Sequence, residues 1–359
     1  MTPEQRWQFD VDGMIVVPNA LDPQQVAQMN AAMDARSAAG LEVGGSTNRV
    51  QDSHRDNPLH FSPAFRRALD NPRIAPILEE LIGSGGVAGG GFYDAAEQEL
   101  PTYRIDHVNL NHIDRTPGSG LHNTGDGSSH AGGSQFFQAQ DRRFFNGLLV
   151  VAYELRDTID NDGGFGCVPG THKANSPMPS QWQDLSGGGV GPPNLRRVPA
   201  RAVMSRILQM LSPAHTFPMF HHSMYERTSV SLRTGNLVCA LADWLTAQLS
   251  AHAFEPDQGD AIIFTEVLTH VTLPWSGQSG PRRVIFYKFS PHGVAYSGNY
   301  LSAGEFEHYN DVTPRILSLL EAPNARYPGR PKDFRYELAA TDQGRKTTAQ
   351  SGRRQVARL

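Results

Sequence analysis

The sequence has little cysteine and no long apolar run. Its 359 residues include only two cysteines, Cys167 and Cys239, which excludes a disulfide framework or a cysteine-rich metal site and favours a reducing compartment. No apolar stretch is long enough to cross a bilayer. Residues 1–20 lack the basic start and apolar core of a signal peptide. We therefore expect a soluble, cytoplasmic protein.

A strong excess of one charge is also missing. The formal net charge is −4, which gives no electrostatic reason to expect nucleic acid or an anionic membrane as a partner. Glycine and proline are abundant instead, with 35 and 25 residues, and they predict many turns. The length is sufficient for a large core.

Strands are predicted where short apolar or β-branched runs, or a period of two, occur. These stretches are residues 13–18, Tyr103–Asp114, Asn146–Leu155, Ala261–Phe264 and Val284–Tyr287. Helices are predicted over Pro23–Ala39, which follows Asp22, and over Pro63–Ile82, which prolines divide into two pieces.

The stretch from Gly259 to Lys288 combines two predicted strands with residues suited to a cofactor site. Between the strands lie His270 and the pair Arg282-Arg283. An imidazole can ligate a divalent metal, and the fork of a guanidinium can hold a carboxylate through two hydrogen bonds.

Two motifs resemble the phytanoyl-CoA dioxygenase family of Fe(II)- and 2-oxoglutarate-dependent oxygenases. The first joins THVTLPW to RRVIFYKFSP within residues 269–291, and the second is GGFGCVPGTHKAN at 163–175. The resemblance runs from about residue 100 to 300. It implies a mainly β protein, a double-stranded β-helix (jelly roll, cupin-like) with flanking N-terminal helices.

The predicted domain organisation is a single oxygenase domain, 1–330, with its core at 100–300. Residues 203–257 interrupt that core with helical patterns around His221-His222, and we interpret them as a helical insertion that forms a substrate lid or a homodimer contact. Residues 331–359 are polar and basic and are predicted to be a flexible tail.

The resemblance assigns roles to several residues. His270 and His122 correspond to the two iron-binding histidines, and Arg282 to the arginine that holds the far carboxylate of 2-oxoglutarate, since Arg283 should point to the opposite face of the strand. Thr272 corresponds to a hydroxyl that assists this carboxylate. His172 is expected to be a structural turn residue, while Tyr103, Asn109 and Asn111 face the pocket only if the strand phase is right.

The third iron ligand departs from the family pattern. Related sites use two histidines and a carboxylate, but Thr124 stands where His-x-Asp would place the acid. Four alternatives remain: Asp126 from the adjacent glycine-containing loop, Glu266 from the strand before His270, the upstream pair His112 and Asp114, or no protein carboxylate. Thr124 would crowd a halide in the vacant position.

The expected activity is hydroxylation of an unactivated C–H bond of a small organic substrate by O₂, with 2-oxoglutarate converted to succinate and CO₂. The alternatives are halogenation or desaturation by the same iron-dependent chemistry, or a non-catalytic relative that binds a ligand. Coenzyme A recognition has no signal in the sequence, and the family name does not identify the substrate.

Overall fold

A computed structural model of the chain describes most of its first half and a C-terminal part. The described residues are 1–41, 43, 57–82, 100–123, 136–140, 143–158, 163–174, 178–182, 192, 194–197, 257–294, 300–323 and 325. The α-helices are α1 (Pro3–Asp12), α2 (Pro23–Ala38), α3 (Pro63–Leu69), α4 (Ala75–Leu81) and α7 (Pro314–Leu319). Short 3-10 turns are η1 (Pro58–His60), η4 (Thr171–Lys173), η5 (Ser180–Trp182) and η6 (Ala303–Glu305).

A five-stranded antiparallel sheet forms the centre of the fold, in the order β1-β8-β5-β10-β2. Its strands are β1 (Met14–Val17), β2 (Tyr103–Ile113), β5 (Leu149–Glu154), β8 (Ala261–Thr265) and β10 (Arg282–Pro291). All five strands match predicted stretches. The register of β10 on β2 shifts between Lys288 and Phe289, so this bulge adds Asp106 to β2 opposite that step.

A smaller sheet has the order β7-β6-β9, and a separate hairpin joins β3 to β4. Their bounds are β3 (Phe137–Gln140), β4 (Arg143–Asn146), β6 (Gly164–Cys167), β7 (Arg196–Arg197) and β9 (His270–Leu273). Two isolated β-bridges add to the smaller sheet next to β9. Thr116 pairs with Trp275, and His122 pairs with His270.

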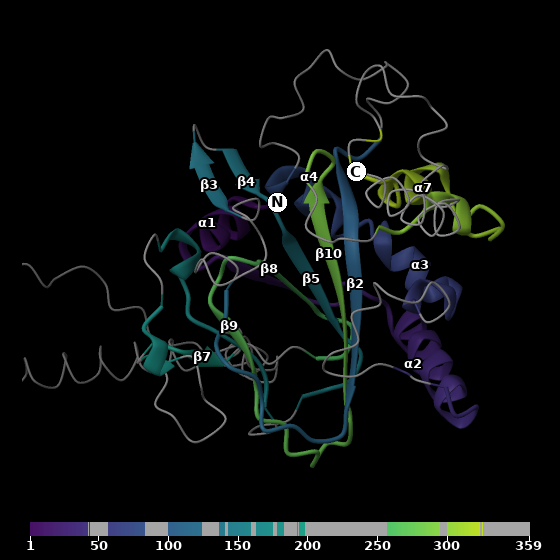
Figure 1. Cartoon of the computed structure of the whole chain (residues 1–359), viewed down its shortest axis with the longest axis horizontal. Coiled ribbons are helices and arrows are strands. Elements are labelled where there is room, and N and C mark those ends of the chain that lie inside the picture. Colours follow the sequence, from purple (N-terminus) through teal and green to yellow (C-terminus); the bar gives the residue numbers. More distant parts are fainter. Residues whose placement is uncertain are drawn as a thin grey trace, which may run out of the picture.

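The large sheet lies between the helices and the smaller sheet (Figure 1). The outer face packs against the helices, and its apolar residues from β1, β2, β5, β8 and β10 share one core with α1 to α4 and α7. The inner face packs against the smaller sheet, because Val150, Ile262 and Val284 share a second core with Phe165 and Cys167 of β6. Two facing sheets with antiparallel strands make the predicted double-stranded β-helix, and the mainly β class is confirmed.

Local signals explain where several helices begin. Asp22 caps α2 by accepting a hydrogen bond from the Gln25 amide at 2.7 Å. Helix α1 was not predicted from its apolar pattern, because only Phe9 is buried; its signal is the capping box formed by Thr2 and Gln5.

A glycine permits the close crossing of β6 with the chain after β9. Gly163 has φ of +89°, and a Cβ built there would lie 2.0 Å from the Pro274 carbonyl oxygen. Only glycine accepts both conditions.

The helical insertion predicted at 203–257, with His221 and His222, lies outside the described residues except for Asp257, as does the tail predicted at 331–359. Among the residues that the structure describes, no helix combines the length and the apolar character needed to cross a membrane.

Candidate functional site

Two histidines that are far apart in the sequence lie side by side at the β9 edge of the smaller sheet. His122 and His270 form an antiparallel bridge in which each backbone amide donates to the other residue's carbonyl, at 3.0 and 2.9 Å. Their ring centroids are 4.3 Å apart. The backbone pairing therefore fixes both imidazoles in one place.

The rings are also fixed in the tautomer that a metal requires. Nδ1 of His122 lies 2.8 Å from the Gly120 carbonyl oxygen, and Nδ1 of His270 lies 2.7 Å from that of Leu268. A carbonyl only accepts hydrogen bonds, so each Nδ1 carries a proton, and Nε2 is the nitrogen left to bind a metal. Such carbonyl partners typically orient metal-binding histidines.

His270 is held in its neutral form. Burial, together with the charge of His122, lowers the pKa of His270 to about 3, although Glu266 acts to raise it. The ring lies against Phe264, with centroids 4.9 Å apart. Neutral imidazole is the form that ligates metal, so the environment of His270 suits a ligand.

Arg282 points into the same inter-sheet space from the start of β10. Its side chain is 2% exposed, and its Nη2 donates to Oε1 of Glu154 at 3.0 Å. Within the described part of the chain, its Nε and Nη1 have no hydrogen-bonding partner. Burial raises the pKa of Glu154, even though Arg282 acts to lower it. The guanidinium thus retains donors for an anion.

Arg283 faces the other way, as the alternation of the strand predicts. Its guanidinium donates to Asp34 and Asn30 of α2 and, at 3.0 Å, to Nδ1 of His112. His112 therefore lies on the outer face of β2, with Arg283. The structure does not bring His112 and Asp114 to His270, and this alternative for the metal site is wrong.

Glu266 lies near the imidazole pair but is engaged elsewhere. Both of its carboxylate oxygens lie 3.0 Å from Nζ of Lys288. Burial would raise the pKa of Glu266, but Lys288 and His270 lower it to about 2. Within the described residues, no three His, Cys, Asp or Glu side chains form a metal-binding group. Thr124 and Asp126 lie outside those residues, so Asp126 stays a prediction.

The remaining candidates divide between the two faces. Thr272 shares the inner side of β9 with His270, because their partners Phe165 and Cys167 belong to the inner core. Asn109 and Asn111 lie opposite Phe286 and Val284 on the inner face of the large sheet.

Tyr103 instead packs in the outer core, 5.6 Å from Phe289 between ring centroids. It does not face the pocket.

His172 lies away from this site. Its Nε2 donates to the Asp10 carbonyl at 3.1 Å, and its ring packs edge-on against Phe137 with centroids 4.6 Å apart. These contacts attach α1 to the turn after β6, as expected of a structural residue.

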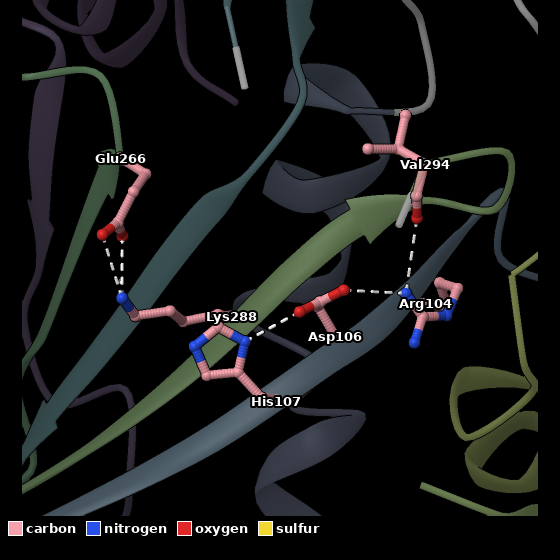
Figure 2. A network of polar contacts seen from close by, with 6 residues as sticks. All are labelled: Arg104, Asp106, His107, Glu266, Lys288 and Val294. Atoms are coloured by element: carbon pink, nitrogen blue, oxygen red, sulfur yellow. Dashed lines mark hydrogen bonds and ion pairs between the residues drawn. The ribbon is translucent and has the colours of Figure 1, made fainter. Parts of the chain in front are cut away.

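Two functional candidates were missed in the sequence, Lys288 and Glu154. Lys288 lies on the same face of β10 as Arg282, so extending the period of two from Arg282 would have found it. Figure 2 shows Lys288 with Glu266 and, beside it, a chain of polar contacts from His107 through Asp106 to Arg104. Glu154 had no distinguishing signal, because it ends a run of apolar residues.

Comparison with known proteins shows the family and the fold. The family model described as "Phytanoyl-CoA dioxygenase (PhyH)" matches residues 9–284. The crystal structure of HygX from Streptomyces hygroscopicus with nickel and 2-oxoglutarate bound has a TM-score of 0.51 and 15% identity, and the similarity covers 82% of this chain and 89% of that one. At this identity the likeness shows the fold alone.

Two further solved structures have TM-scores below 0.5. HygX with iron bound has a TM-score of 0.49 and 16% identity, covering 82% of this chain and 89% of that chain. The non-heme alpha ketoglutarate dependent epimerase SnoN from nogalamycin biosynthesis has a TM-score of 0.41 and 14% identity, covering 81% and 82%. A search of curated proteins gives no match.

The residues on the inner face fit the groups that this family uses. Two imidazole nitrogens are available to a metal, and two buried guanidinium donors are available to a carboxylate. The family model covers more than half of the sequence. The chain belongs to the phytanoyl-CoA dioxygenase family of Fe(II)- and 2-oxoglutarate-dependent oxygenases.

Proposed function

We propose that the chain hydroxylates an unactivated C–H bond of a small organic substrate. The balanced reaction takes substrate, O₂ and 2-oxoglutarate to hydroxylated substrate, succinate and CO₂. When bound, Fe(II) and 2-oxoglutarate together supply the oxidising chemistry, and the protein supplies binding, orientation and exclusion of water.

His122 and His270 are the proposed iron ligands. The observation that carries the proposal is their shared geometry: both rings present a lone pair on Nε2, and reciprocal backbone hydrogen bonds hold them together. Asp126 is the proposed third ligand, since Glu266 is already engaged by Lys288.

Arg282 is the proposed anchor for the far carboxylate of 2-oxoglutarate. Two unpartnered buried donors are costly to leave without an acceptor, and a carboxylate supplies two acceptor oxygens in the geometry of the guanidinium fork. Thr272, on the side of β9 that faces this space, is proposed to add a hydroxyl to the same carboxylate.

Apolar side chains lie beside His270 and Arg282, whereas His122 is exposed among the described residues. Phe264 and Val284 belong to the inner core, and Phe286 packs against it. A dry enclosure strengthens electrostatic contacts and suppresses side reactions.

The test is the formation of succinate. Purified protein with Fe(II) and 2-oxoglutarate under air should release succinate, and His270→Ala should abolish this release while the protein still melts cooperatively. A wild-type protein that binds 2-oxoglutarate but forms no succinate would favour the non-catalytic alternative.

A chloride-dependent product would favour halogenation, and a product two hydrogens lighter than the substrate would favour desaturation.

The single domain over 1–330, the insertion at 203–257 as a lid or dimer contact, and a cytoplasmic location complete the proposal. Removal of 203–257 should alter substrate turnover if the insertion is a lid, and oligomeric state if it is a contact.

A further inference from the structure

A second cation, Lys288, lies on the inner face of β10. It is six residues after Arg282, so the period of two places both on one face. Its Nζ contacts both carboxylate oxygens of Glu266 at 3.0 Å, and the two side chains are 14% and 6% exposed. In Figure 2 the pair reaches across β5, from β10 to the end of β8.

This ion pair lies beside the two histidines. Glu266 stands in the turn from β8 to β9, four residues before His270. Lys288 is opposite Val150, which is opposite Phe264, and the Phe264 ring contacts His270. The pair is therefore close to the proposed reaction centre.

Stability alone is a weak reason for a charged pair in this position. Val150, Phe264 and Phe286 of the inner core lie beside it, and His107 lies opposite Lys288. Replacement of a buried ion pair by apolar side chains of similar volume is often neutral or stabilising. Charged groups enclosed beside a reaction centre are candidates for binding or catalysis.

The hydrogen-bonding capacity of the pair indicates what it can bind. A lysine ammonium has three donors, and a carboxylate has lone pairs beyond those that meet the ammonium. The two charges compensate each other. A hydroxyl group accepts from Lys288 and donates to Glu266, whereas a carboxylate is repelled by Glu266 and an ammonium by Lys288.

The side chain of Asn109, near this pair, has an amide oxygen that needs a hydrogen-bond donor. Oδ1 of Asn109 is buried and has no partner among the described residues. Asn109 lies two residues after His107, which is opposite Lys288, so it shares the inner face with the ion pair. An amide oxygen accepts from a hydroxyl but not from a carboxylate.

We propose that Lys288 and Glu266 bind a neutral hydroxyl of the substrate, with Asn109 accepting from another, and so select a polyhydroxylated, sugar-like molecule over an apolar or charged one. This inference rests on the function proposed above. It contrasts with Arg282, whose free donors suit the anionic co-substrate.

The first test is binding to protein loaded with Zn(II) and 2-oxoglutarate. The probes are methyl glucoside and myo-inositol as neutral polyols, glucuronate as an anion, glucosamine as a cation, and octanoate as an apolar chain. Saturation-transfer NMR should show a neutral polyol binding at least tenfold more tightly than the other three. Preference for octanoate, glucuronate or glucosamine, or no binding of either polyol, would overturn the inference.

The second test removes the pair without leaving a lone charge. The double variant Lys288→Met, Glu266→Gln should weaken binding of the preferred polyol at least tenfold, with the dissociation constant of 2-oxoglutarate changed less than twofold and the melting temperature retained. Lys173→Met is the matched control, because it breaks an exposed ion pair with Asp10. Unchanged polyol binding in the double variant would contradict the proposal.

Measuring succinate formation distinguishes a failure of the proposed oxygenase function from a failure of the proposed substrate selection. If wild-type protein with Fe(II) forms no succinate, the proposed oxygenase function fails, and this inference with it. If succinate forms but neither polyol binds or increases its rate, the selection of a polyhydroxylated substrate alone is wrong.

Discussion

The neighbouring arginines Arg282 and Arg283 lie on opposite faces of β10 and differ in how completely their guanidinium groups are hydrogen-bonded. On the outer face, Arg283 is satisfied by side chains of α2 and β2. On the inner face, Arg282 has one carboxylate partner and two donors left over. A complete set of protein partners indicates a structural role, and an incomplete set in a buried place indicates a ligand.

The largest effect is expected at the histidine pair. His122→Ala or His270→Ala should lower succinate formation at least about 10³-fold, since each removes a proposed metal ligand. Metal binding, followed by calorimetry, should weaken in parallel. His112→Ala, on the outer face, is the control and should keep activity within a few-fold; equal losses in all three variants would contradict the assignment.

Arg282 should show the next largest effect. The double variant Arg282→Met, Glu154→Gln avoids an unpaired buried carboxylate and should weaken 2-oxoglutarate binding about 100-fold, the order expected when a charged partner of a carboxylate is lost. Calorimetric titration with Zn(II)-loaded protein measures it. An affinity within twofold of wild type would exclude Arg282 as the anchor.

The structural histidine His172 should make the stability of the protein depend on pH. Burial, with the charge of Lys173, lowers the pKa of His172 to about 4, so this histidine binds its proton more readily when unfolded. The contribution of His172 to the free energy of unfolding should be full above pH 6.5. It should decrease by up to about 3 kcal/mol as the pH falls toward 4.

Denaturant unfolding of wild type and His172→Asn at several pH values measures this contribution. The difference in unfolding free energy should shrink in acid. The exposed His308→Asn serves as control, and a pH-independent difference for His172 would contradict the linkage.

Arg283 should show the smallest effect and sharpen the contrast with Arg282. Arg283→Met should lower the unfolding free energy by about 1–2 kcal/mol through its lost hydrogen bonds, because its partner Asp34 is 60% exposed. Binding of 2-oxoglutarate should not change. Denaturant unfolding and calorimetry together check this, and a tenfold loss of affinity would remove the distinction between the two faces.

Much of the fold was predictable because burial leaves a periodic pattern. The strands β5, β8 and β10 are apolar runs or alternate with period two, and Asp22 marks the start of α2. Helix α1 and the hairpin β3–β4 were missed because few of their side chains carry that pattern. Helix α7 was also missed, since it is short and follows the resembling region.

The site was predictable only in part. The motif resemblance predicted that His122 and His270 form one site although they are far apart in the sequence. No local pattern could show this. The acid was not predictable, since it depends on which carboxylate the fold brings to the rings and which one another cation already engages. Glu266 illustrates this, because its pairing with Lys288 is a long-range contact without a local signal.

The reciprocal backbone bridge between His122 and His270 has a kinetic consequence. Both rings are already aligned by the peptide ladder, so an incoming ion finds a preorganised chelate and need not draw two loose segments together. Metal binding to the folded protein should therefore be fast and should leave the backbone around the rings unchanged. During folding, the two histidines can meet only after the long chain segment between them has closed into a loop.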